Sequence, residues 1–265
     1  MLLFARVDVL GVAWLRIASA ALVFAIWRRP LRTLALLDRD GRVLVVSLGA
    51  VFAVMNACFY VSIDHLPLAT VAAIEFIGPI VLALLGARVP RNLAAVAIAA
   101  LGVLFLTHVQ LAGEPLGVAF AFANAALFAA YIVLAHRLSR RPEVSGIDGL
   151  ALAMLFAFVF LSPIGLAGAA HAFSDPIALA AGIGVGVSSS VVPYVLDQLA
   201  MARLARATYA LFVALLPAIA VLIGVVVLQQ VPSVPDLAGI ALVMAAVSLH
   251  QPEARAPDPA ILDRS

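Results

Sequence analysis

Charged residues are scarce in this sequence. They make up 11% of its 265 residues, lysine is absent, and all 16 basic residues are arginines. An ordinary soluble domain is about 25% charged. This shortage argues against a soluble globular protein, and a hydrophobic share of 65% predicts an integral membrane protein that has the lipid bilayer as a partner.

Cysteine and histidine are also scarce. Cys58 is the single cysteine, so an internal disulfide is excluded, and its position in an apolar run is typical of a buried small side chain. The five histidines lie scattered, without the spacing of metal ligands. The sequence contains no nucleotide-binding loop and no catalytic motif. We therefore predict no metal site, no cofactor and no enzymatic activity.

Apolar runs of about 20 residues dominate the chain, and a helix of that length crosses the roughly 30 Å hydrocarbon layer of a bilayer. The runs lack the alternating polar and apolar residues of a transmembrane β-barrel. We predict an all-α, polytopic membrane protein with nine transmembrane helices, at residues 9–27, 43–62, 67–86, 92–108, 115–136, 147–168, 177–199, 206–228 and 233–250.

Arginines follow the first, third, fifth, seventh and ninth predicted spans, whereas the connections after the other spans contain none. Loops rich in arginine remain on the cytoplasmic side of a membrane. The arginine loops and the C-terminal tail are therefore expected to be cytoplasmic. This topology also explains the pI of about 9.1, so we predict no nucleic-acid partner.

A weak internal repeat becomes visible when the sequence is shifted by 138 residues. The shift places Pro79 on Pro217 and Gly86 on Gly224. It moves each predicted span five places along the chain, and because five is odd, the two copies must cross the membrane in opposite directions. Inverted repeats are common in secondary transporters, whose binding sites lie near the membrane midplane between the copies.

The repeat predicts three parts: a first repeat at 1–111, a second repeat at 112–250 and a cytoplasmic tail at 251–265. The counterpart of the span at 115–136 would fall before Met1. We therefore expect the first repeat to lack the first helix of a ten-helix, five-plus-five arrangement. Either the start is misassigned or truncated, or the protein works with nine spans.

Four polar side chains lie deep in the predicted spans. Counting about 1.5 Å per residue from the outer span ends places Arg16, Glu75 and Asn124 roughly 12 to 14 Å deep, and Asn56 about 9 Å deep. A charge in the hydrocarbon layer costs roughly 3 kcal/mol, so Glu75 is a candidate for function. The alternative is a role in assembly, through an ion pair with Arg16 or a bond to a neighbouring helix.

Two proline sites are expected to break helices at equivalent places of the repeat, Gly78-Pro79 and Leu216-Pro217, because proline removes a donor and clashes with the preceding turn. Each kink is either the pivot of a rocking motion or a static bend that neighbouring helices accommodate. Near the midplane of the seventh span, we interpret the run Ser188 to Ser190 as a site of close helix packing rather than of ligand contact.

The segment from Asn56 to Leu85, NACFYVSIDHLPLATVAAIEFIGPIVLALL, resembles the equivalent segment of bacterial threonine and homoserine exporters. The shared features are Tyr-x-Ser-Ile from Tyr60, Pro-Leu from Pro67 and Glu-Phe-x-Gly-Pro from Glu75. Nearly the whole chain, about residues 8–250, resembles the EamA transporters of the drug/metabolite transporter superfamily.

The resemblance implies a secondary transporter of the bacterial inner membrane that exports a small polar metabolite, above all an amino acid such as threonine or homoserine, by alternating access. The residues expected to line its cavity are Asn56, Tyr60, Glu75, Asn124 and Tyr194. If Glu75 carries a proton, export would be coupled to a proton gradient, although a uniporter would have the same sequence features. The alternatives are a transporter of a purine, a nucleotide sugar or a toxic amine, and a truncated membrane protein that does not transport.

Overall fold

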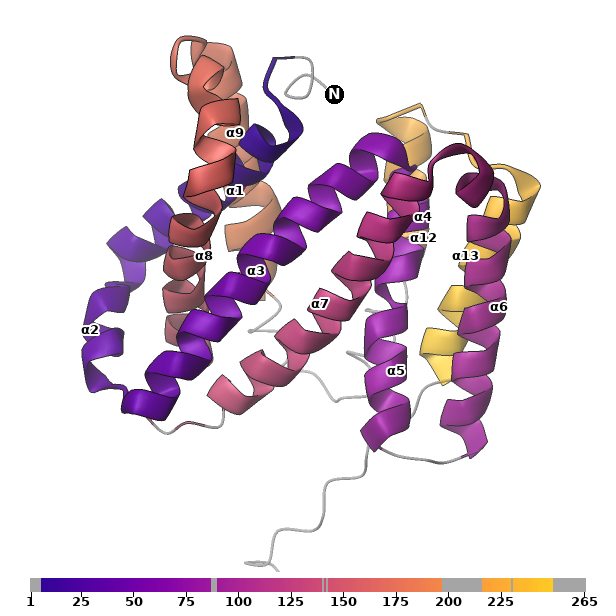
Figure 1. The fold of residues 1–265 in the computed structure, drawn as a ribbon, viewed down its shortest axis with the longest axis horizontal. Helices are drawn as coiled ribbons and strands as arrows, with labels where there is room; N and C mark the ends of the chain where they lie inside the picture. Colours follow the sequence, from indigo (N-terminus) through magenta and orange to yellow (C-terminus); the bar gives the residue numbers. More distant parts are fainter. Residues whose placement is uncertain are drawn as a thin grey trace, which may run out of the picture.

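The computed structural model describes residues 6–86, 90–139, 141, 143–196, 216–229 and 231–249. These ranges contain helices and no strand, which confirms the predicted all-α fold class (Figure 1). The elements are α1 (Val9–Arg28), α2 (Pro30–Leu36), α3 (Arg39–His65), α4 (Leu68–Glu75), α5 (Ile77–Gly86), α6 (Pro90–Gly113), α7 (Pro115–Ser139), α8 (Gly146–Ala169), η1 (Ala170–Phe173), α9 (Pro176–Gly186), the π-helix η2 (Val187–Val191), α12 (Leu216–Val226) and α13 (Val234–Leu249).

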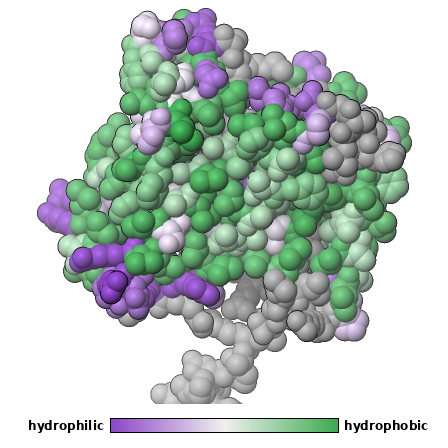
Figure 2. Space-filling view, in the orientation of Figure 1, coloured by the Kyte–Doolittle hydropathy of each residue, from purple (hydrophilic) through white to green (hydrophobic). Residues whose placement is uncertain are grey.

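Five described helices are long and apolar enough to cross a membrane: Val9–Arg28, Arg39–His65, Pro115–Leu138, Gly146–Phe173 and Pro176–Leu196. Large apolar side chains face outward, with Ile26 74% and Leu104 62% exposed. Figure 2 shows a broad apolar surface between two ends where hydrophilic residues gather. Such a surface suits lipid, and helices satisfy their own backbone hydrogen bonds there. The molecule is a helical polytopic membrane protein.

The predicted spans correspond to helices wherever the structure describes them. The spans at 43–62 and 92–108 lie within α3 and α6, which extend beyond them. The span at 206–228 is described only in its last part, as α12, because residues 197–215 lie outside the described residues. The structure adds α2, a short helix after α1 that no apolar run predicts.

The long helices pack in pairs. α1 lies antiparallel to α8: a Cβ atom at Gly11 would collide with the backbone of Gly168, and the other ends are joined by an ion pair of 2.7 Å between Arg28 and Asp148. α3 packs along α7, and α6 along α13. Small residues at such crossings let helix backbones approach closely in a membrane.

Buried apolar side chains form two main cores. The first lies among α1, α3, α8 and α9 and includes Phe24, and the second lies among α4, α6, α7 and α13 and includes Ile74. α7 contributes to both, since its first half packs in the second core while Phe128 packs against the first. The polar residues singled out in the sequence lie near this junction.

The helix break predicted at Gly78-Pro79 is present. α4 ends at Glu75, and α5 begins at Ile77. Pro79 has no N–H to donate to the carbonyl of Glu75 four residues earlier, so the bond that would have joined the two helices is missing. The expected break at Leu216-Pro217 lies at the edge of the described residues, because α12 begins at Leu216.

Candidate functional site

One face of α3 and one face of α7 carry polar side chains into the interior. Phe52, Asn56 and Tyr60 follow at four-residue intervals and share one face of α3. Their exposed fractions are 0%, 2% and 5%. On α7, Asn124 and Phe128 share a face in the same way, and Asn124 is fully buried.

Glu75, the last residue of α4, lies beside Asn124. Gly78 permits this approach: a Cβ atom there would collide with the carbonyl oxygen of Ala125, so glycine lets the start of α5 rest on the backbone of α7. The Glu75 carboxylate faces the Asn124 amide. The carboxylate is close enough to interact with this amide, although no bond of regular hydrogen-bonding geometry reaches either polar atom of Asn124 among the described residues.

The two buried asparagines differ in their hydrogen bonds. Asn56 donates from Nδ2 to the carbonyl oxygen of Phe52, at 2.8 Å. Within the described part of the chain, neither Nδ2 nor Oδ1 of Asn124 has a partner. A buried polar group left in this state costs about 1–3 kcal/mol. The amide of Asn124 is therefore available to a group that is not part of the helices.

Arg16 of α1 reaches the same region from another side. Its Nε donates to the Ser190 hydroxyl at 2.8 Å, and its Nη2 donates to the Ser189 carbonyl at 3.1 Å. Its Cζ lies 5.8 Å from the centre of the Tyr60 ring, which is a cation–π arrangement. Its positive charge also acts on Glu75 through space.

The ion pair between Arg16 and Glu75, one form of the structural alternative for Glu75, is not formed. None of the ion pairs among the described residues, at a limit of 4.0 Å, joins these two groups. The reason is that the neutral oxygens of η2 hold the guanidinium of Arg16. The two interior charges lie in the same region without neutralising each other directly.

η2 is the π-helical turn that presents these oxygens. Single π-turns within longer helices are often found at functional sites. A Cβ atom at Gly186 would collide with the Ser19 hydroxyl, so this glycine lets the start of η2 pack tightly on α1. Our interpretation of the serine run as a packing element was incomplete, because the fully buried Ser190 also binds Arg16.

Phe52 connects two tyrosines. Its ring centre lies 5.2 Å from that of Tyr131 and 5.5 Å from that of Tyr194, in edge-on contacts. Such contacts contribute about 0.5–1.5 kcal/mol beyond burial. Phe52 was not among the residues predicted from the sequence, although its spacing from Asn56 and Tyr60 is a signal that could have identified it.

The structure brings some of the predicted residues together and leaves others apart. We define the polar centre as the group Arg16, Tyr60, Glu75, Asn124 and Ser190. Asn56 lies one helical turn from Tyr60, and its Nδ2 donates to the Phe52 carbonyl. Tyr194, one turn beyond Ser190, lies in the aromatic group around Phe52. Among the described residues, no group of acidic, cysteine and histidine side chains could hold a metal.

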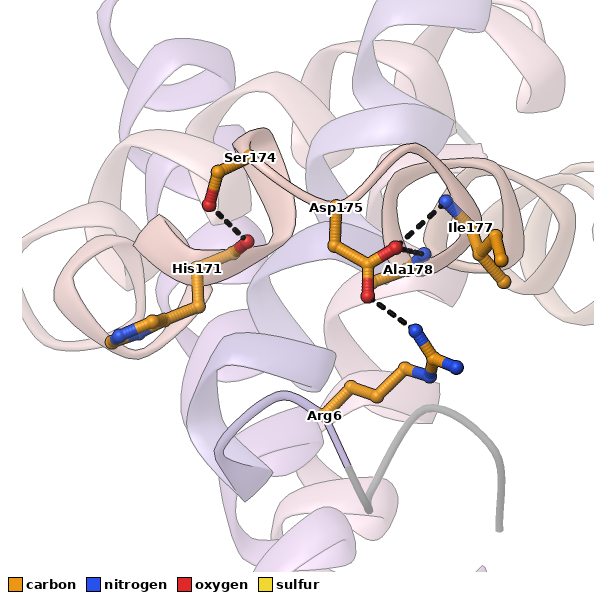
Figure 3. A network of polar contacts seen from close by, with 6 residues as sticks. All are labelled: Arg6, His171, Ser174, Asp175, Ile177 and Ala178. Carbon is orange, nitrogen blue, oxygen red and sulfur yellow. Dashed lines mark hydrogen bonds and ion pairs between the residues drawn. The ribbon is translucent and has the colours of Figure 1, made fainter.

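Ion pairs join several of the charged residues at the helix ends. Asp38 accepts a 2.7 Å bond from Arg141, and this bond, together with a backbone N–H, lowers the pKa of Asp38. At the opposite end, Arg6 and two backbone N–H groups at the start of α9 lower the pKa of Asp175 (Figure 3). These pairs join segments that are distant in the sequence.

An open pocket of about 560 Å³ lies near the Asp38–Arg141 pair. It is lined by side chains of α3 and α7, including Ser47 and Arg137. α3 and α7 also carry the two buried asparagines deeper in the molecule. The pocket itself lies at the end of the molecule where the described arginine loops gather.

Polar and charged side chains inside a bundle of membrane-spanning helices are typical of polytopic proteins that move small polar molecules or ions across the membrane. Comparison with known proteins agrees with this class. The model of the EamA-like transporter family matches residues 115–250, and the chain belongs to this family.

Curated relatives match most of the chain. The threonine/homoserine exporter RhtA of Salmonella typhimurium (strain LT2) is 31% identical over 235 residues, which cover 86% of this chain and 77% of that protein. The threonine/homoserine exporter RhtA of Escherichia coli (strain K12) is 30% identical over 253 residues, with 92% and 82% covered. No solved structure matches the chain significantly.

Proposed function

We propose that the protein exports small amino acids, threonine and homoserine in particular, across the bacterial inner membrane. Its relatives are named for these two amino acids. The observation that carries the proposal is the polar centre, where a carboxylate and a guanidinium lie inside a helical membrane protein without forming an ion pair. An amino acid carries one ammonium and one carboxylate group, so it complements both charges.

In this proposal Glu75 binds the ammonium group and Arg16 binds the carboxylate group. Arg16 is suited to this task because a guanidinium has five N–H donors, and its bonds to described residues use Nε and Nη2. Tyr60 and Asn124 line the site beside these charges. In the same proposal Asn56 and Tyr194 line the site farther out, and both contact Phe52.

Transport proceeds by alternating access between inverted repeats at 1–111 and 112–250. Two packing contacts support this division: α1 lies on α8 and α6 on α13, and in each contact a span meets its own counterpart under the 138-residue shift. An in-plane two-fold axis brings equivalent elements together in this way. The range that matches the family model, 115–250, corresponds to the second repeat.

The arginine-bearing end faces the cytoplasm in this proposal, and the tail at 251–265, which lies outside the described residues, is on the same side. The pocket beside Arg137 and Arg141 supports this orientation, since a cytoplasmic opening would admit substrate for export. Glu75 is also our candidate for a proton carrier, which would couple export to the proton gradient.

The test is amino-acid efflux from cells that lack other exporters. Replacing Glu75 by glutamine keeps the size of the side chain and removes its charge. We expect threonine and homoserine efflux to fall at least about tenfold, because losing one partner of a buried charged contact costs about 2–5 kcal/mol. The matched control is Glu143→Gln, which changes an exposed carboxylate in the loop before α8.

Unaltered efflux by a correctly inserted Glu75→Gln protein would contradict the role of this charge. A wild-type protein that exports neither amino acid would contradict the proposed substrate. The same assay should therefore include a purine, a nucleotide sugar and a toxic amine. Dependence of wild-type efflux on the pH gradient, lost in Glu75→Gln, would support proton coupling.

A further inference from the structure

The side chain of Asn124 has hydrogen-bonding capacity that the protein does not use. It is 0% exposed, and both its donor Nδ2 and its acceptor Oδ1 lack partners among the described residues. Native proteins rarely leave buried polar groups in this condition, and each exception calls for an explanation. Asn124 lies beside Glu75 and therefore belongs to the region where the substrate's charged groups would bind.

Neither charged group of a bound amino acid is expected to pair with the Asn124 amide. The ammonium group is matched by Glu75, and the carboxylate group is matched by Arg16, which η2 holds in place. Asn56 differs from Asn124, because one N–H of its Nδ2 donates to the Phe52 carbonyl. Asn124 is thus left to bind the side chain of the substrate, which is the part that distinguishes one amino acid from another.

The unpaired Nδ2 and Oδ1 atoms of Asn124 suit a hydroxyl group as their hydrogen-bond partner. A hydroxyl donates one hydrogen bond and accepts others, so it can donate to Oδ1 and accept from Nδ2. A hydrocarbon side chain can do neither and would leave both atoms of the amide unpaired. Sites that hydrogen-bond a substrate hydroxyl therefore reject analogues that lack it far more strongly than apolar pockets reject a difference in size.

We propose that Asn124 recognises the side-chain hydroxyl of the transported amino acid and selects hydroxylated amino acids over apolar ones of the same size. This inference rests on the proposed function and deepens it by naming the residue that distinguishes threonine and homoserine from apolar amino acids of the same size. Asn124 sets the specificity, while Glu75 and Arg16 bind the backbone groups that all amino acids share.

Two analogues isolate the hydroxyl. Removing it from either threonine or homoserine gives the same compound, 2-aminobutyrate. Valine has the shape of threonine with a methyl group in place of the hydroxyl. We would measure the affinity of the purified full-length protein for these four amino acids by ligand-induced thermal stabilisation, together with their efflux from cells.

The wild-type protein should bind threonine and homoserine about tenfold or more tightly than 2-aminobutyrate and valine. In Asn124→Leu, threonine and homoserine should lose this advantage while 2-aminobutyrate binds as before, so that the ratio falls to about one. Asn124→Ser, which keeps a shorter donor and acceptor, should retain part of the preference. The control is Ser62→Ala, because Ser62 is equally buried but donates to the Gly117 carbonyl between helices.

Three results would overturn the inference. The first is a wild-type protein that binds threonine and 2-aminobutyrate equally well. The second is an Asn124→Leu protein, or an Asn124→Ser protein if leucine prevents folding, that keeps the full preference or weakens for all four amino acids alike. The third is a wild-type protein that binds none of the four, and this result alone would also overturn the proposed function.

Discussion

Three ion pairs join elements at the two ends of the molecule: Arg6–Asp175, Arg28–Asp148 and Arg141–Asp38. The polar centre in its interior is built differently. Arg16 binds uncharged oxygens there, the Glu75 carboxylate is in no described ion pair, and the Asn124 amide is unpaired within the described residues. The incomplete bonding lies where desolvation makes it most expensive.

This contrast indicates what each region does. Paired charges at the water-facing ends fix the positions of helix termini, although exposed pairs contribute little stability. Unmet hydrogen bonds in the interior lower stability, so their presence needs a compensating role. Binding a polar ligand is such a role, because the ligand supplies the missing partners while it is bound.

The largest effect on stability and export is expected from Gly186→Ala, which adds a methyl group where η2 packs on α1. A Cβ atom there would collide with Ser19 and with the backbone of Arg16, whereas one at Gly184 meets nothing within 4 Å. We expect Gly186→Ala to destabilise the protein by about 1–3 kcal/mol and to weaken export, because α1 and η2 must separate. Gly184→Ala, on the same helix, should leave both unchanged or raise stability slightly.

Thermal unfolding in detergent measures the stability of both glycine variants, and the efflux assay measures their activity. Equal melting temperatures for the two variants would show that the close contact between η2 and α1 does not hold Arg16 in place.

Replacing the two buried asparagines is expected to change the free energy of unfolding by a smaller amount, with opposite signs at the two sites. Asn124→Leu should stabilise the unliganded protein by about 1 kcal/mol or more, because it removes unpaired polar atoms. Asn56→Leu should destabilise it by about 0.5–1.5 kcal/mol, because it removes a made hydrogen bond. The measurement is the melting temperature of each variant without substrate. A loss of stability in both variants would mean that Asn124 has a structural partner.

The smallest effect is expected at the helix ends, at low pH. The pKa of Asp38 is lowered by its bond to Arg141. A lowered pKa contributes stability above the unfolded value of about 3.9, and this contribution is lost as the pH falls through the folded pKa. Asp38→Asn should therefore make the melting temperature fall less steeply between about pH 5 and pH 3, as a pH series of melting curves would record. An unchanged dependence of the melting temperature on pH would mean that the Asp38–Arg141 pair contributes no electrostatic stability.

Much of the fold follows from the sequence because the bilayer imposes a simple rule. A helix must be long and apolar to cross it, so the spans at 9–27 and 43–62 are visible as runs of hydrophobic residues. The break at Pro79 is visible for an equally local reason, the missing N–H. α2 was not predicted, because it is short and lies outside the apolar runs.

The candidate site was less predictable because it depends on contacts between distant segments. Depth along a helix placed Glu75 and Asn124 at one level, and the structure brings them side by side. The partner of Arg16 was not foreseen, since Ser190 lies 174 residues away in the sequence and nothing in the sequence shows where its hydroxyl points. The unpaired state of Asn124 depends on side-chain geometry and could not be read from the sequence.

The most direct test of the account is an experimental structure of the full chain with threonine bound. We expect the amino acid in the polar centre, with its ammonium group on Glu75, its carboxylate group on Arg16 and its hydroxyl within hydrogen-bonding distance of both side-chain atoms of Asn124. Threonine bound elsewhere, with the Asn124 amide still unpaired, would contradict the account.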